Sequence, residues 1–236
     1  MGYLTKYGTL WGNFPSFAGR TFWVGPGSST VTTTIVDGRT VTMSDNNDGL
    51  SPERPLATIT QALTNATASA QDAIVLMPGT HNASTQTGQT AAAALAFSKA
   101  GVTVIGLPYD PGYSRFGQRP QAIITSAAAT VPAVVTAADV TFLNVGFLAP
   151  TGQSAMTYVL ASNRLTVRGC HFDLTVGGAS TAGMTATATL APTDLLVEDC
   201  IFDVDNTGTS GSFALNVGAA KRFLVKGCRF RFSAQG

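Results

Sequence analysis

The sequence predicts an all-β protein, a right-handed parallel β-helix whose coils are about 25–30 residues long, with an N-terminal capping helix. Three observations carry this prediction. A strand-like segment repeats along the second half of the chain. Apolar and charged residues fall into register when the repeats are aligned. A short helix-forming segment precedes the first repeat and is suited to close one end of a stack.

The repeat consists of four similar segments in the last hundred residues, which begin at Val140, Leu165, Leu195 and Phe223. Their offsets are 25, 30 and 28 residues, and two earlier segments, from Ile74 and from Val102, resemble the same strand at an offset of 28. The offset of 38 between Val102 and Val140 predicts one coil with a longer loop around residues 109–119. Each segment alternates apolar and polar residues with period two, bends near the position of Gly169, and alternates again, as half-buried strands do.

Aligned repeats place side chains of one kind at one position. Two columns are expected to point inward, a cysteine column of Cys170, Cys200 and Cys228 and a phenylalanine column of Phe147, Phe172, Phe202 and Phe230. Stacked thiols can form a metal or redox site. Zinc, however, favours clustered thiolates with a loop spacing such as CxxC, and cysteine is a common small buried residue. We therefore expect a structural cysteine column.

Charged residues test the same register on the outer side. Three outward columns result, namely Asp139, Arg164, Asp194 and Arg222, then Arg168, Glu198 and Lys226, then Asp173 and Asp203 followed by Arg231. Opposite charges on neighbouring strands attract one another modestly. Because charged and apolar columns select the same offsets, we expect the members of each column to be vertical neighbours.

Three parts are expected along the chain, namely an aromatic-rich arm (1–23), an entry strand, turn and capping helix (24–70), and the parallel β-helix (71–236). Ser51 is the expected N-cap of the helix, with Pro52 and Glu53 in its first turn. One apolar face of that helix is formed by Leu56, Ile59, Leu63 and Ala66.

Two features predict an interface. The first 23 residues hold seven of the 20 aromatic residues. This arm is expected either to pack on its own chain or to bury aromatic side chains in a neighbouring molecule, namely Tyr3, Tyr7, Trp11, Phe14 and Phe17. The outer charge columns also become apolar toward the N-terminus, at Met77, Ile105, Leu143 and Leu148. An exposed apolar surface usually marks an interface, unless loops between the coils cover it.

The last coil predicts a third contact surface. Phe230 and Phe232 point inward from the final repeat, and four residues follow them, so the end of the core is expected to be open and to need a cover from another chain. On this ground we expect the protein to be an oligomer.

Residues with catalytic potential are few. Asp173 above Asp203 could flank a glycosidic bond or hold a cation, but a surface pair relieved by Arg231 is the simpler interpretation. His81 is expected in a loop and His171 at an outward position, neither with a catalytic partner. Catalytic, metal-binding and cofactor-binding residues are therefore expected to be absent.

Composition excludes other classes. A net charge of +1 argues against nucleic acid as a partner, and no apolar run is long enough to span a membrane. Charged residues make up only 11% of the chain, against about 25% in ordinary domains. A surface with so few charges favours a protein that functions as part of an assembly. Three cysteines and the lack of a signal-peptide pattern favour synthesis in a reducing cytoplasm.

Several motifs carry a family resemblance. Residues 48–59 (DGLSPERPLATI), 72–80 (DAIVLMPGT) and 102–107 (VTVIGL) resemble the opening of pectate-lyase-like β-helices, and more narrowly of β-helical proteins of tailed bacteriophages. The resemblance covers roughly residues 20–236. It implies a non-enzymatic virion protein on the outer capsid surface, made in the bacterial cytoplasm, a homotrimer that decorates the head by binding the major capsid protein. The alternative is a tailspike or receptor-binding protein that binds or cleaves host surface glycan.

Overall fold

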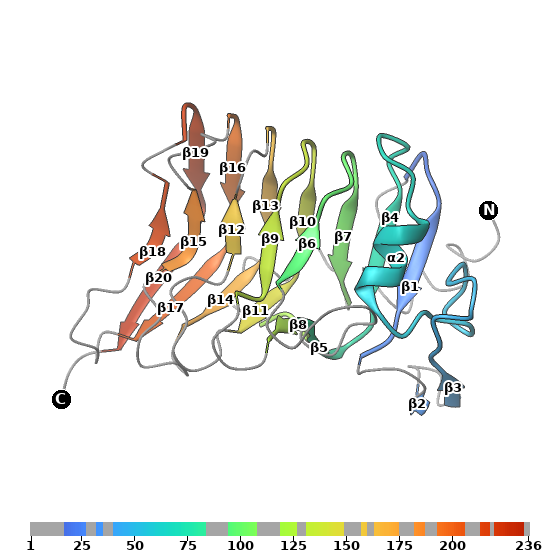
Figure 1. Ribbon diagram of the computed structural model, residues 1–236. Helices are drawn as coiled ribbons and strands as arrows, with labels where there is room; N and C mark the ends of the chain where they lie inside the picture. The colour runs from blue at the N-terminus through green and yellow to red at the C-terminus, as the bar shows by residue number, and fades with distance from the viewer. Residues whose placement is uncertain are drawn as a thin grey trace.

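The computed structural model is mostly β-strand, and the part of the chain that it describes contains three long parallel sheets and one helix. It describes residues 17–26, 32–34, 40–83, 94–107, 119–126, 131–148, 157–159, 163–174, 182–186, 193–205, 213–217 and 220–233. Figure 1 shows the three sheets running side by side from β1 near the N-terminus to β18, β19 and β20 near the C-terminus.

The first sheet has seven strands, in the order β1 (Thr21–Val24), β4 (Ala73–Leu76), β7 (Thr103–Gly106), β10 (Thr141–Leu143), β13 (Thr166–Arg168), β16 (Leu195–Glu198) and β19 (Phe223–Lys226). The second sheet has six, β5 (Gly79–Asn82), β8 (Ala122–Thr125), β11 (Gly146–Leu148), β14 (His171–Asp173), β17 (Ile201–Asp205) and β20 (Arg229–Ser233). The third sheet has five, β6 (Leu95–Phe97), β9 (Ala133–Val135), β12 (Thr157–Val159), β15 (Ala182–Ala186) and β18 (Phe213–Asn216). A separate antiparallel pair joins β2 (Thr32–Thr34) to β3 (Thr40–Thr42).

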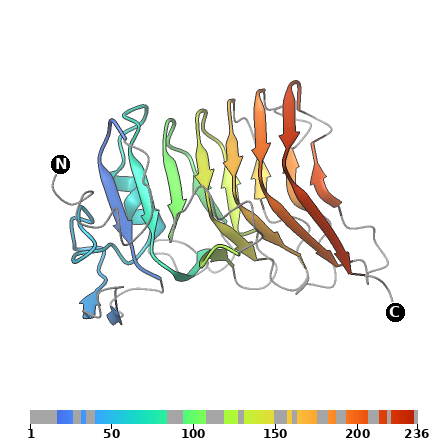
Figure 2. The same ribbon diagram turned by 180° about the vertical axis from the view of Figure 1, so that it is seen from behind.

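The chain visits these sheets in rotation. From β4 onward each passage adds one strand to the first sheet, the next to the second and the next to the third, and we call the strands of one passage a rung. Figure 2 shows from behind how the rungs follow one another along the molecule. Because each inward side chain lies above its counterpart in the preceding rung, the rungs share one continuous core.

A left-handed residue turns the chain from the first sheet into the second. Asn144, Gly169, Asp199 and Gly227 occupy this corner with φ between 53° and 65°. Asparagine, aspartate and glycine are the residues that tolerate this conformation best. The corner predicted near Gly169 is therefore confirmed, and it recurs in four rungs.

Strand register confirms both inward columns. The rings of Phe147, Phe172, Phe202 and Phe230 stack with centroids 4.9, 4.8 and 5.2 Å apart. Cys170 and Cys200 are buried beside them, and Cys228 is half-buried. Burial raises the pKa of the Cys200 thiol, and a hydrogen bond with Cys200 together with burial raises that of Cys228. Raised thiol pKa values oppose metal binding and redox chemistry, which need the thiolate.

The predicted register is wrong at the first repeat. Ile74 pairs with Val104, at an offset of 30 residues, so Val75 and not Met77 lies beside Ile105. The two candidate offsets differ by two residues, so they put the same side chains inward, and alternation alone cannot distinguish them. The long coil between Val102 and Val140 is confirmed by the pairing of β7 with β10.

Helix α2 (Ile59–Asn65) lies against β1, β4 and β6, at the end of the stack near the N-terminus (Figure 1). Leu56, Ile59, Leu63 and Ala66 are all buried as predicted, but Leu56 precedes the helix and Ala66 is its C-cap, so the apolar face is confirmed on the helix for Ile59 and Leu63. The predicted N-cap is wrong. The helix begins after Thr58, which has extended backbone and whose hydroxyl accepts a hydrogen bond from the Gln61 amide. Leu56 lies before the helix and forms a parallel bridge to Val24 of β1.

Strand β1 begins at Thr21, inside the segment expected to form the arm. Phe22 and Trp23 are buried, so the end of that segment belongs to the first sheet.

Candidate functional site

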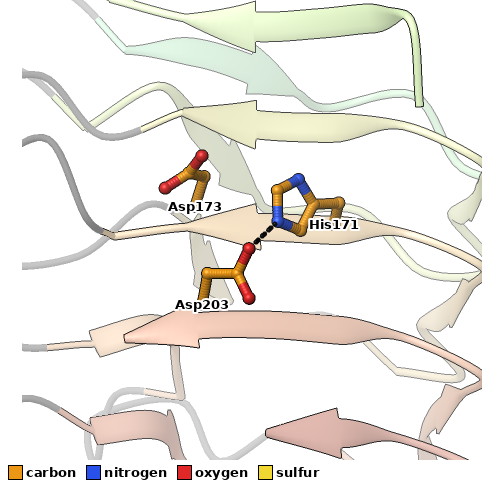
Figure 3. Close-up of side chains that lie close together, drawn as sticks. All are labelled: His171, Asp173 and Asp203. Atoms are coloured by element: carbon orange, nitrogen blue, oxygen red, sulfur yellow. Dashed lines mark hydrogen bonds and ion pairs between the residues drawn. The ribbon is translucent and has the colours of Figure 1, made fainter. Parts of the chain in front are cut away.

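Three side chains with ligand chemistry gather on the outer face of the second sheet, opposite the phenylalanine column. His171 and Asp173 extend from β14, and Asp203 extends from the neighbouring strand β17 (Figure 3). His171 is only 5% exposed and Asp203 only 4%. The sequence placed both residues on the outer side correctly, but the expectation that His171 lacks an acidic partner is wrong.

Asp203 is the centre of this cluster. Its Oδ2 atom accepts hydrogen bonds from His171 Nε2 and from Arg119, both at 2.9 Å. Arg231 donates to both carboxylate oxygens, at 2.5 and 2.9 Å. Arg119 also reaches Asp173, at 3.3 Å. The predicted relief of the acidic pair by Arg231 is confirmed as an ion pair with Asp203, and Arg119 supplies a second cation that the sequence did not indicate.

The cluster is tuned toward a neutral histidine and an ionised aspartate. Burial lowers the pKa of His171, against the opposing effect of its hydrogen bond to Asp203. Burial alone would raise the pKa of Asp203, but hydrogen bonds from His171 and Arg231 outweigh it and hold that pKa below its ordinary value. Nε2 of a neutral imidazole can then donate to the carboxylate.

A metal ion is the ligand that such residues most often bind, and one ligand atom from each of the three lies within 4.8 Å of the others. The donor set nevertheless fits a cation poorly. Both oxygens of Asp203 already accept from arginine, and two guanidinium groups balance the two carboxylates. A divalent ion would have to displace Arg119 or Arg231. The arrangement works chemically as a self-neutralised network that joins neighbouring rungs.

Two further outward columns are confirmed by ion pairs. Arg164 pairs with Asp139 at 2.5 Å, and Arg222 pairs with Asp194 at 2.6 Å. Glu198 lies between two cations, with Arg168 at 3.5 Å and Lys226 at 2.8 Å. Most of these side chains are substantially exposed, so solvent screens their attraction, and the pairs matter mainly as evidence of register.

The predicted apolar outer surface is largely absent. Met77, Ile105 and Leu143 are 2%, 0% and 8% exposed, while Leu148 is half-buried beside Asp173. Met77 packs in a small second core with Trp23, Val41 of β3, Val75 and Leu107. Met77 is therefore covered by strands β1 and β3 of its own chain, whereas the competing explanation expected loops between the coils to cover it.

Of the five arm residues predicted to form an interface, Phe17 alone lies within the described residues. It is half-buried and lines a shallow hollow with Ser69, Gly101 and Asp139 on its own chain. Tyr3, Tyr7, Trp11 and Phe14 lie outside the described residues.

Large apolar side chains are exposed at the other end of the molecule. Phe223 and Leu224 of β19 are 54% and 55% exposed, and Phe230 and Phe232 of β20 are 41% and 62% exposed. We call β19 and β20 with the preceding Lys221 and Arg222 the terminal edge. The exposure predicted for Phe230 and Phe232 is confirmed, and Phe223 and Leu224 are exposed as well on the preceding strand.

Comparisons with family models, with curated proteins and with solved structures gave no match to this chain. Within the part of the chain that the structure describes, no helix is long and apolar enough to cross a membrane.

Proposed function

We propose that the chain is a right-handed parallel β-helix that serves as a non-enzymatic structural protein of a bacteriophage virion. In this role it decorates the outer capsid surface, binds the major capsid protein and stabilises the head. It needs no cofactor. The phage assignment rests on the sequence resemblance, and the structural role rests on the surface described above.

The terminal edge is the observation that supports a structural role. Four large apolar side chains lie exposed on the last two strands of the stack, β19 and β20, and exposed apolar surfaces usually mark interfaces. Strands at the edge of a sheet also present backbone groups that another chain can pair with. A rigid stack that binds several shell subunits stabilises the shell by mass action.

Cosedimentation with purified capsids of the source phage tests this role. We expect the protein to sediment with capsids, and Phe232→Asp to weaken binding because it places a charge at the exposed edge. Leu50→Asp is the matched control, since Leu50 is similarly exposed at 48% but lies in the segment next to β1. No cosedimentation, or equal losses in both variants, would reject the proposal.

Trimerisation is a second part of the proposal. Identical chains usually associate with closed rotational symmetry, and β-helices commonly associate side by side. Sedimentation equilibrium at micromolar concentration is expected to give three times the mass of one chain. A single species of one chain's mass would reject the trimer.

A glycan-cleaving tailspike is the second candidate, and the observation that favours it is the pairing of His171 with Asp203 beside Asp173. Acid–base cleavage needs a carboxylate that can reach the glycosidic oxygen, whereas Asp203 is buried and engaged by two arginines. Release of reducing ends from host surface polysaccharide would establish this candidate. We expect no release.

A further inference from the structure

The last two rungs carry opposite charges. Residues 193–205 contain five acids and no base, namely Asp194, Glu198, Asp199, Asp203 and Asp205. Residues 221–233 contain five bases and no acid, namely Lys221, Arg222, Lys226, Arg229 and Arg231. An acidic rung therefore lies directly beneath a basic one.

The structure joins these rungs by three ion pairs, Arg222 with Asp194, Lys226 with Glu198 and Arg231 with Asp203. Inside the stack Glu198 meets a cation on each side, Arg168 below and Lys226 above. All three outward columns end at the terminal edge on a cation. A strand added to this edge would therefore be stabilised by acidic side chains opposite these cations.

The inward side chains of the terminal edge are apolar but exposed, unlike their counterparts one rung earlier. Phe223 is 54% exposed, whereas Leu195, its counterpart one rung earlier, is 1% exposed. Phe230 is 41% exposed, whereas Phe202 beneath it is fully buried. A shallow hollow of about 330 Å³ runs along this edge between Leu195, Leu196, Phe223 and Leu224.

We infer that the terminal edge binds an acidic, extended segment of a partner polypeptide, which adds to the first and second sheets as the next pair of strands. Strand addition of this kind takes affinity from backbone hydrogen bonds and specificity from alternate side chains. The partner places acids opposite Lys226 and Arg231 and apolar side chains opposite Val225 and Phe230. The inference deepens the proposed function and rests on it, because it names the chemistry of the segment by which a shell protein would bind.

A second copy of this chain fits the edge poorly. Two terminal edges brought together would oppose ten positive charges, which is unfavourable in the low-dielectric setting of an interface. The opposite end of the first sheet is closed by its own chain. There the Trp23 amide donates to Gly49, and the amides of Leu56 and Gly25 complete a ladder at 2.8 and 2.9 Å.

A peptide with the sequence of residues 194–205 is the probe, because this acidic rung already packs on the basic rung in the folded chain. Its Cys200 is replaced by serine to prevent disulfide formation. A fluorescent label reports binding to the full chain by anisotropy. The control peptide carries lysine in place of its five acids and keeps every apolar residue.

We expect saturable binding of the acidic peptide and none of the lysine peptide. The affinity should fall at least about tenfold in Lys221→Glu and in Arg229→Glu, two exposed cations of the edge whose replacement leaves the three ion pairs intact. Lys99→Glu makes the same change of charge away from the edge and should change the affinity less than about twofold. Circular dichroism confirms that the variants are folded.

The inference is overturned if the acidic peptide does not bind, if the lysine peptide binds equally well, or if both edge variants bind like Lys99→Glu. These outcomes are separate from a failure of the proposed function. Cosedimentation with capsids but no peptide binding would reject the acidic strand and keep the role. Peptide binding without cosedimentation would keep the acidic partner and reject the capsid.

Discussion

His171 and Asp203 are joined by a hydrogen bond of 2.9 Å although they are not directly opposite one another in the sheet. His171 pairs with Ile201 in register, and Asp203 pairs with Asp173. The bond is therefore diagonal across two strands, a distance that long side chains can span. The two stacked carboxylates of Asp173 and Asp203 would repel each other. Hydrogen bonds from His171, Arg119 and Arg231 to Asp203 offset that repulsion.

Asp203→Asn should destabilise the protein more than Asp173→Asn. Asp203 is buried and accepts from three side chains, so loss of its charge weakens several bonds at once and should cost about 1–3 kcal/mol of unfolding free energy. Arg119 reaches Asp173 only at the longer distance of 3.3 Å, and replacement of Asp173 should cost less than about 1 kcal/mol. Urea unfolding at pH 7 measures both, and equal small costs would show that the network contributes little.

The register of the second half was predictable from the sequence because it follows from period and alternation. Five repeated features, two apolar and three charged, select the same alignment from Val140 to Arg231, and strand pairing confirms it. Near Ile74 only alternation was available, which leaves offsets of 28 and 30 equally good, and the prediction there is wrong.

The candidate site was only half predictable. Stacking of Asp173 on Asp203 follows from the repeat, but the diagonal bond to His171 depends on side-chain length and burial, which alternation does not report. Arg119 comes from the long coil, 84 residues before Asp203, at a place where no repeat constrains the chain. The prediction of an exposed apolar outer surface was wrong for a similar reason. Met77 is covered by Trp23 and Val41, which come from a distant part of the sequence.

Position in the phenylalanine column should determine the cost of removing a ring. Phe172 is fully buried between Phe147 and Phe202, so Phe172→Ala should cost about 3–5 kcal/mol of unfolding free energy. Phe230 stacks on one side only and is 41% exposed, so Phe230→Ala should cost roughly half as much or less. Chemical denaturation of the two variants tests this order, and a Phe230 variant as unstable as the Phe172 variant would contradict it.

Gly106 is required for a close approach of two rungs. A Cβ at this position would overlap the carbonyl oxygen of Asn144, a backbone atom that cannot rotate away, so Gly106→Ala should cost about 2–3 kcal/mol. Gly169→Asn is the control, because Asn144 already adopts the same left-handed corner conformation, and it should cost less than about 1 kcal/mol. Thermal unfolding of both variants distinguishes steric overlap from a general intolerance of glycine replacement.

His81 should make the protein sensitive to mild acid. The sequence suggested a loop, but His81 lies in β5, is 1% exposed and bonds through Nε2 to the Met77 carbonyl. Burial lowers its pKa from 6.5 to about 4, against the opposing effect of that bond. Between these two values the unfolded chain binds a proton and the folded chain does not, so stability is lost as pH falls from 6.5 toward 4. The full effect of this histidine is about 3 kcal/mol.

His81→Gln separates this contribution from that of His171, whose lowered pKa acts in the same direction from pH 6.5 downward. A glutamine amide can still donate to the Met77 carbonyl but does not titrate. Unfolding free energies at pH 7 and pH 4.5 should therefore differ less in the variant than in the wild type, by roughly 2–3 kcal/mol. The difference that remains in the variant belongs to His171 and the carboxylates. If the two proteins lose the same stability over this range, His81 is protonated in the folded state and its burial does not control its charge.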